Sequence, residues 1–221
     1  MNTVLIAHYQ KDIRWIKEIT ADVDIKIYST SDPSKIYITP NKGMDANMYL
    51  RYIIDNYNNL PERTLFAHHH REDWTQDYPL PYIINNLNWE LNDYFNIGAR
   101  KHYGDVFIID PRTKQWLKDI WFLFEKHIPY PSQLFYYAGT QFMCHKKLIE
   151  QYPKTYWQQL YSWLMTTTLP DWLSGRIFEW TWHYILTKNP IDPKYQINEI
   201  IKQRRIFYVT TNLWFFIRFR F

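Results

Sequence analysis

The chain has 221 residues, of which 46% are hydrophobic, enough for one large domain or two small ones around a real core. Its net charge of +4 is only mildly basic, and its basic residues cluster only at Lys202, Arg204 and Arg205. A nucleic-acid-binding protein usually has a denser basic stripe, so we expect no nucleic-acid partner. This charge suits a small ligand with one or two phosphates better than a polymer.

The single cysteine, Cys144, cannot form an internal disulfide, which favours an intracellular, cytoplasmic location. The first apolar run is too short for a signal peptide, and no segment approaches the ~18 apolar residues of a membrane span. The tail, from about residue 190 to residue 221, is apolar and aromatic but contains Arg218 and Arg220. A final strand, an interfacial segment and the end of a domain cut from a longer chain all remain open for it.

Aromatic residues make up 19% of the chain, far above ordinary usage. Two interpretations stay open. The rings pack in an aromatic core, or some of them lie exposed and stack on sugars or bases.

Hydrophobic periodicity predicts alternating strands and helices. Residues 3–9 form a β-branched, mostly apolar run typical of a central strand, and residues 44–57 repeat apolar positions at helical spacing. The predicted order is strand 3–9, helix 12–19, strands 25–29 and 35–39, helix 44–57, strand 63–69, helix 81–91, strand 105–110, helix 113–127, strand 139–145, and helices 154–165 and 175–186.

This alternation indicates an α/β fold with a largely parallel central sheet. Ligands in such sheets bind beyond the carboxyl ends of the strands. His8 and Tyr9 follow the first strand, and residues 68–73 follow a later one. We therefore expect these two polar clusters to meet at one edge of the sheet.

His68 and His70 form the strongest candidate metal site. Neighbouring side chains on a strand point to opposite faces, so His68 and His70 are expected to converge while His69 is not. Glu72, Asp73 and Asp77 follow closely and offer the oxygen ligands that Mn²⁺ or Mg²⁺ prefers. Arg71 is expected to contact a phosphate. The alternative is a hydrogen-bonded strand end that holds no metal.

Three other motifs are weaker candidates for a ligand site, two of them in turns and the third on a helix. Asn41, Lys42 and Gly43 open a helix whose first turn, with Asp45, could favour an anion, although the segment matches neither a Walker nor a dinucleotide motif. Gly139 permits close approach of a ligand to the backbone.

Glu179 and His183 are four residues apart on a helix and could act on a metal or an acceptor hydroxyl. Asp171 and Arg176 are weaker candidates nearby. For each of these motifs, the alternative is an ordinary turn, a helix start or a surface hydrogen bond.

Four segments together resemble, in order, the signature segments of a family of uncharacterised proteins common in fungi and algae. They are IAHYQKDIRWI (6–16), TPNKGMDANMYLRYIIDNYNNLPERTLFAHHHREDW (39–74), YYAGTQFMCHKKLI (136–149) and GRIFEWTWHYIL (175–186). The likeness runs from about Val4 to Ile185, and the whole is similar to the first domain of a chlorella-virus glycosyltransferase of that family.

The resemblance implies one GT-A-type domain over residues 1–221, with a central mixed sheet flanked by helices. It implies a glycosyltransferase that moves a hexose from a UDP-sugar to a glycan or glycoprotein acceptor with Mn²⁺ or Mg²⁺. Retention of anomeric configuration, a role in viral capsid glycan synthesis and a location in the host cytoplasm are implied as well.

The resemblance also implies site roles. Ala7, His8 and Tyr9 take the uridine position. His68 and His70, with Asp73, stand where the family of GT-A enzymes usually has D-x-D, which is a departure. The chemistry of the residues themselves, apart from the resemblance, offers Asp77 and Glu179 for the sugar hydroxyls and the acceptor, and Asn41, Lys42, Arg71 and Gly139 for the nucleotide.

Two other functions remain open from the residues. A metal-dependent hydrolase would use the same histidines to activate water and would need no nucleotide. A non-catalytic carbohydrate-binding or nucleic-acid-binding module would depend on the aromatic rings, and chelators would not affect its binding.

Overall fold

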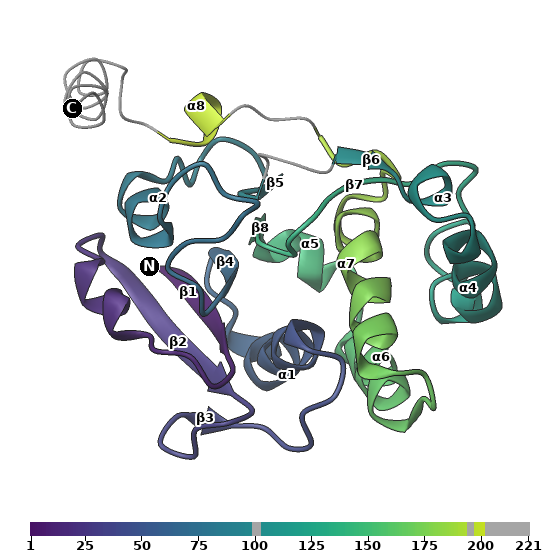
Figure 1. The fold of residues 1–221 in the computed structure, drawn as a ribbon, viewed down its shortest axis with the longest axis horizontal. Helices are drawn as coiled ribbons and strands as arrows, with labels where there is room; N and C mark the ends of the chain where they lie inside the picture. The colour runs from purple at the N-terminus through teal and green to yellow at the C-terminus, as the bar shows by residue number, and fades with distance from the viewer. Residues whose placement is uncertain (99–102, 194–196, 202–221) are drawn as a thin grey trace, which may run out of the picture.

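The computed structural model describes residues 1–98, 103–193 and 197–201, and its architecture confirms the predicted α/β fold (Figure 1). The central sheet has six strands in the order β3-β2-β1-β4-β8-β5. Strands β3, β2, β1 and β4 are parallel, and β8 is antiparallel to both of its neighbours. The strands are β1 (Asn2–His8), β2 (Val23–Ser29), β3 (Ile36–Tyr37), β4 (Arg63–His68), β5 (Tyr94–Asn96) and β8 (Phe142–His145). A separate antiparallel pair joins β6 (Tyr103–Asp105) to β7 (Phe135–Tyr137).

Helices cover both faces of the central sheet (Figure 1). Side chains alternate along each strand, so Leu5 and Phe66 pack under α1, α6 and α7, whereas Val4 and Leu65 pack under α2 and α8. The described helices are α1 (Asp45–Asn56), α2 (Leu80–Asn86), α3 (Val106–Ile109), α4 (Arg112–Ile120), α5 (Lys146–Glu150), α6 (Lys154–Thr166), α7 (Asp171–Thr187) and α8 (Ile197–Ile200), with 3-10 turns η1 (Arg14–Glu18), η2 (Tyr57–Asn59) and η3 (Trp121–Leu123).

Most of the aromatic residues belong to the core. Phe66 and Phe142 stack at 4.9 Å between ring centroids, and Trp157 and Trp182 stack at 6.4 Å. A few large rings are exposed instead, among them Trp74 at 56% and Trp172 at 50%. The aromatic excess therefore lies largely in the core, and the stacking of exposed rings on sugars or bases stays a prediction.

The prediction of a strand over residues 105–110 is wrong. The Asp105 side chain accepts a hydrogen bond from Phe107 N at 3.0 Å and caps a short helix, α3. An N-cap of this kind overrides the strand preference of the apolar run Val106–Ile109. Strands β5, β6 and β7 and helices α5 and α8 were not predicted, because each is only three to five residues long.

Three predicted helices are shorter than expected. Residues 12–19 form only the 3-10 turn η1, and the helix predicted over 113–127 gives way to η3 after Ile120. The helix over 81–91 stops at Asn86, because Leu87 bridges to Ile201 and Asn88 N donates to Ile200 O at 2.7 Å. The cluster Lys202, Arg204 and Arg205 lies outside the described residues, as does the tail beyond Ile201.

Across the three described ranges, no helix is both long enough and apolar enough to cross a bilayer.

Candidate functional site

A chamber of about 430 Å³ opens at the carboxyl ends of β1 and β4, where the sequence predicts a site. Its walls come from these strand ends, the start of α1, the turn before β8 and the first half of α7. We call it the first chamber. In the sheet register Ala7 lies beside His68, so the two polar clusters meet as predicted.

Most of the predicted site residues lie in the wall of the first chamber. The set is Ala7, Tyr9, Asn41, His68, His70, Asp73, Gly139 and Glu179. His8, Lys42, Arg71 and Asp77 do not line it.

His68 and Asp45 form the centre of the site. His68 Nε2 lies 3.5 Å from Asp45 Oδ2, and both side chains are mostly buried. Within residues 1–98, 103–193 and 197–201, neither atom has a hydrogen-bond partner. Burial lowers the pKa of His68, but the carboxylate of Asp45, with smaller contributions from Asp73 and Glu179, more than offsets it, and the net pKa lies above the ordinary value.

His69 also lines the first chamber, contrary to the prediction from strand alternation. Strand β4 ends at His68, so the alternation does not extend to the next two residues. The His69 ring donates from Nδ1 to Ala7 O at 3.1 Å. Burial and the neighbouring His70 lower the pKa of His69 to about 4.

His70 is the more accessible of the two later histidines. Its ring centroid lies 6.4 Å from that of His68. Burial and the nearby His68 lower the pKa of His70. His70 is therefore neutral at neutral pH, the form that binds metals.

Backbone hydrogen bonds hold this segment in place. Gln141 Oε1 accepts from His68 N at 3.1 Å, and Trp15 Nε1 donates to His69 O at 2.8 Å. Asp73 Oδ1 accepts from both the backbone N and the hydroxyl of Thr75, at 2.8 and 2.6 Å. The positions of His68 and Asp73 are thus fixed by groups outside the chamber.

Glu179 enters the first chamber from α7, and its Oε1 accepts a hydrogen bond from Gly139 N at 2.9 Å. Gly139 has φ +102°, and a Cβ there would lie 2.7 Å from Thr75 Oγ1, so no other residue fits. Burial raises the pKa of Glu179, partly opposed by the hydrogen bond from Gly139. Gly139 therefore lies in the chamber wall, where a ligand could approach it, but its N–H already donates to Glu179.

Close packing of two glycines brings α7 against the loop before α1. A Cβ on Gly175 would lie 2.9 Å from Gly43 O, and a Cβ on Gly43 would lie 2.3 Å from Leu164. This approach places Glu179 and Asp45 in the wall of the same chamber. Asp171 and Arg176, the weaker candidates of the sequence, line it as well.

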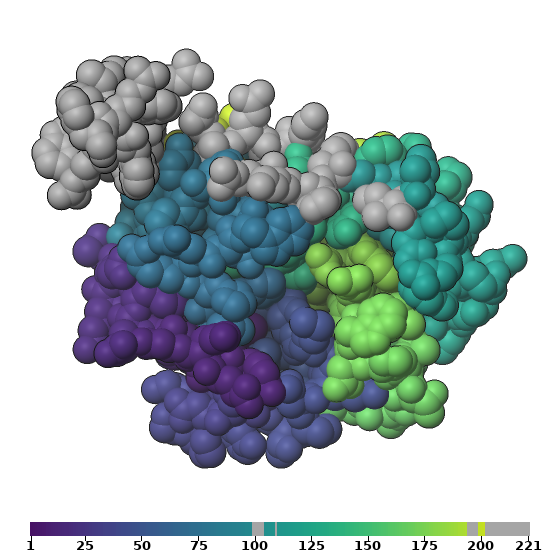
Figure 2. Space-filling model, in the orientation of Figure 1, coloured from purple at the N-terminus to yellow at the C-terminus, as the bar shows by residue number. Residues whose placement is uncertain are grey.

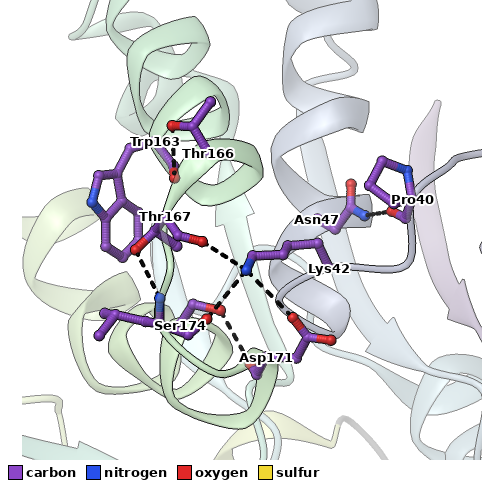
Figure 3. A network of polar contacts seen from close by, with 9 residues as sticks. Pro40, Lys42, Asn47, Trp163, Thr166, Thr167, Asp171 and Ser174 are labelled. Carbon is purple, nitrogen blue, oxygen red and sulfur yellow. Dashed lines mark hydrogen bonds and ion pairs between the residues drawn. The ribbon is translucent and has the colours of Figure 1, made fainter.

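Lys42 is not directed to a phosphate, as Figure 3 shows. Its Nζ donates to Thr167 O at 2.8 Å and Leu169 O at 3.1 Å, and lies 3.7 Å from Asp171. These contacts tie the loop before α1 to the connection between α6 and α7. The prediction of a phosphate contact for Lys42 is therefore replaced by a structural role.

His8 and Arg71 also have partners elsewhere. Buried His8 hydrogen-bonds through Nδ1 with the Ser29 hydroxyl at 2.9 Å and donates from Nε2 to Lys11 O at 2.8 Å. Exposed Arg71 forms ion pairs with Glu18 at 2.9 Å and with Glu72, and does not line the chamber.

Asp77 and His183 lie outside the site too. Gln76 N donates to Asp73 O at 3.0 Å, and this turn leaves Asp77 exposed beyond the chamber. His183 is buried and pairs through Nε2 with Pro190 O at 3.2 Å, and burial lowers the pKa of His183 to about 4.

Sequence reasoning missed Asp45 as a partner of His68. A signal was available, because helices in parallel α/β sheets run antiparallel to the strands and begin at the carboxyl edge. Asp45 is the first residue of α1. Trp74, an exposed ring in the wall, was also missed.

The described side chains do not form a metal centre by themselves. Among residues 1–98, 103–193 and 197–201, no group of three or more His, Cys, Asp or Glu side chains is placed to hold a metal ion. Asp45 and His68 instead provide two closely spaced atoms that could each ligate a metal ion.

Comparison with known proteins gives one match. A family model described as "Protein of unknown function (DUF3431)" matches residues 4–198. No curated protein and no solved structure matches the chain. The family description prints no activity, so any activity is a proposal from the site.

Proposed function

The chain belongs to the family described as "Protein of unknown function (DUF3431)", and we propose that it is a metal-dependent glycosyltransferase whose first chamber takes a UDP-sugar. The observation that carries the proposal is the Asp45–His68 pair. Its two facing atoms, Asp45 Oδ2 and His68 Nε2, are buried, lie 3.5 Å apart, could each ligate a metal ion, and have no hydrogen-bond partner among the described residues. Buried polar atoms without partners are rare and call for a ligand or an ion.

The charge of the first chamber favours a divalent cation with a diphosphate. Its walls carry the carboxylates of Asp45, Asp73, Asp171 and Glu179 against the guanidinium of Arg176. A diphosphate entering alone would meet mostly negative charge. A bound cation would reverse this, since metal ions are the largest local charges in such sites.

The residues fit a cation that shares its ligands with phosphate. Mg²⁺ in phosphate-handling sites is held by one or two protein carboxylates plus substrate oxygens, and Mn²⁺ accepts imidazole as well. Asp45 and His68 would supply the protein side, and His70 and Asp73 line the same chamber. When bound, the cation would neutralise the charge that develops on the departing diphosphate.

The uridine belongs, in this proposal, at the end of β1. Tyr9 is 40% exposed and lines the first chamber beside Ala7, offering a ring against which a base can stack. Because the ring nitrogens of His8 are already paired, we assign base recognition to Tyr9 and to the backbone. The volume of about 430 Å³ lies within the usual range for ligand pockets.

Transfer breaks the bond from the sugar C1 to the β-phosphate oxygen and forms a bond from C1 to an acceptor oxygen. The electron pair leaves with UDP, and the acceptor proton passes to the departing phosphate oxygen, as retention by front-face attack requires. Glu179 would hold the sugar or the acceptor hydroxyl. The acceptor would be a glycan or glycoprotein, with viral capsid glycan synthesis in the host cytoplasm as the setting that the sequence resemblance suggests.

The proposal is tested by turnover. We expect UDP release from one of a panel of UDP-hexoses when Mn²⁺ is present, and none with chelator. A metal-dependent hydrolase would cleave p-nitrophenyl phosphate or acetate with metal alone and release no UDP. That result, or release of UDP unaffected by chelator, would overturn the proposal.

A further inference from the structure

A second chamber of about 300 Å³ adjoins the first. It lies between the start of α3, α4, β7 and the middle of α7. Trp74, Arg176 and Glu179 belong to the walls of both chambers. A ligand in the second chamber would therefore reach the same carboxylate that faces the first.

The second chamber contains a buried hydroxyl that lacks a partner. Thr113 is fully buried in the chamber wall, and its Oγ1 has no hydrogen-bond partner in the described part of the chain. Leaving such a group unpaired is unfavourable, so a ligand that supplies a partner hydroxyl gains affinity from it.

Aromatic rings form much of the rest of the wall. Trp74 is 56% exposed, Tyr136 is half-buried and Trp180, which is mostly buried, lines the chamber from α7. An aromatic ring has a negative face, and the C–H groups of a sugar ring pack well against it. Apolar rings with a few polar groups are the usual lining of a small-molecule site.

The aromatic surface continues outside the chamber. Trp116 on α4 and Trp172 on α7 meet edge to face at 6.1 Å, with Arg112 over the first ring and Arg176 over the second. Figure 2 shows α4 (teal) beside the yellow-green of α7 at the surface. This rim would extend the contact for a ligand longer than one sugar ring.

We propose that the second chamber binds the acceptor and that the acceptor is a carbohydrate, whose reacting hydroxyl meets Glu179 where the two chambers join. The inference rests on the proposed glycosyltransferase function. The polar groups favour a neutral ligand: Asp110 is already paired with Arg112 at 2.8 Å, and Arg176, which lines both walls as Glu179 does, lies over the Trp172 ring. A phosphorylated or strongly cationic ligand would find no matching set of charges there.

The test is ligand-observed saturation-transfer NMR with methyl glycosides of glucose, galactose, mannose, xylose, fucose and rhamnose. Each is titrated into the full chain with UDP and Mn²⁺ present. Thr113→Val and Tyr136→Phe each remove one hydroxyl that belongs only to the second chamber. Thr30→Val is the matched control, because Thr30 Oγ1 is also buried without a partner in the described residues but lies outside both chambers.

We expect at least one glycoside to bind, and Thr113→Val to weaken it about threefold to tenfold, the usual range for one hydrogen bond. Tyr136→Phe should weaken it similarly, while Thr30→Val and the affinity for UDP stay unchanged. Removing the buried unpaired hydroxyl of Thr113 does not endanger folding, and phenylalanine keeps the ring of Tyr136, so both variants remain informative.

Three results would overturn the inference, and they separate it from the proposed function. UDP binding with no glycoside signal would remove the carbohydrate site and leave the donor site standing. Glycoside binding that ignores both variants would place the sugar elsewhere. Glycoside binding that depends on the second chamber, with no UDP binding at all, would refute both the transferase and the acceptor role.

Discussion

His68 Nε2 lies 3.5 Å from Asp45 Oδ2 at the junction of β4 and α1, and among the described residues neither atom has a hydrogen-bond partner. The separation is at the outer limit of hydrogen bonding, so the two groups interact mainly through charge. A cation between or beside them would satisfy both atoms at once. The predictions below follow largely from this pair.

Asp45→Asn should lower the pKa of His68. Burial lowers this pKa, and the variant lacks the Asp45 carboxylate that raises it. The same change should weaken Mn²⁺-assisted UDP binding by more than about tenfold. An NMR titration of the histidines and calorimetry with UDP measure the two effects. Asp77→Asn, an exposed carboxylate outside the chamber, is the matched control and should change neither.

Binding of UDP with Mn²⁺ should strengthen as the pH rises through the raised pKa of His68, because a metal binds only the neutral imidazole. The stability of the fold depends on the protonation of His68 in the opposite direction. The contribution of protonated His68 is fully present below its unfolded pKa of about 6.5 and is lost as the pH rises through the folded pKa.

Calorimetry in two buffers of different ionisation enthalpy checks this, because binding near the pKa should release protons. Asp45→Asn should reduce that release. Binding that strengthens as the pH falls would contradict the assignment of His68 as a ligand.

Glu179→Gln should leave UDP affinity within about twofold but lower transfer by about 10²-fold, the usual cost of misplacing a reacting group. Glutamine keeps an oxygen that can accept from Gly139 N, so the turn before β8 stays in place. Calorimetry and turnover are compared on the same preparation. Equal losses in affinity and turnover would make Glu179 a nucleotide-binding or structural residue.

Periodicity in the sequence was enough to predict the long helices and every strand of the central sheet except β5. Residues 3–9 and 44–57 carry strong apolar patterns and form β1 and α1 with bounds close to those predicted. The position of the site followed from the polar residues after β1 and β4. Short elements such as β7 contain too few residues for any pattern, and they form because other strands are already in place.

The partners of individual side chains could not be predicted in the same way. Lys42 was assigned to phosphate from its place at a helix start and Arg71 from its charge, but Lys42 bonds carbonyls of the α6–α7 connection and Arg71 pairs with Glu18. Those partners lie 53 to 127 residues away in sequence. Only the packing of distant segments decides which charge meets which, and local sequence does not contain that information.

Asp192→Asn should stabilise the fold at neutral pH. Asp192 is 1% exposed; its Oδ2 accepts from Tyr137 N at 3.3 Å, and Oδ1 has no partner in the described ranges. Burial raises the pKa of Asp192 well above its ordinary value, against the opposing hydrogen bond from Tyr137. Stability is therefore lost as the pH rises above the unfolded pKa of about 4, where the unfolded chain ionises.

Urea unfolding at pH 5 and pH 8 measures this. The variant should gain about 1 kcal/mol or more at pH 8, and its stability should depend less on pH. Asp22→Asn, at an exposed position, serves as the control. A variant that loses stability at pH 8 would show that the buried carboxylate is satisfied as an anion.

The most direct test of the proposed donor site is calorimetric titration of UDP into the full chain with Mn²⁺, repeated with chelator, with GDP and with CMP. The account predicts that UDP binds with Mn²⁺, that chelator removes much of that affinity, and that GDP and CMP bind far more weakly. A purine needs more room than uracil, a mismatch costs about 1–3 kcal/mol for each buried group left unpaired, and CMP has no second phosphate to bridge the cation. Binding of GDP or CMP as tight as that of UDP, or UDP affinity unchanged by chelator, would contradict both the uridine site and the metal bridge at Asp45 and His68.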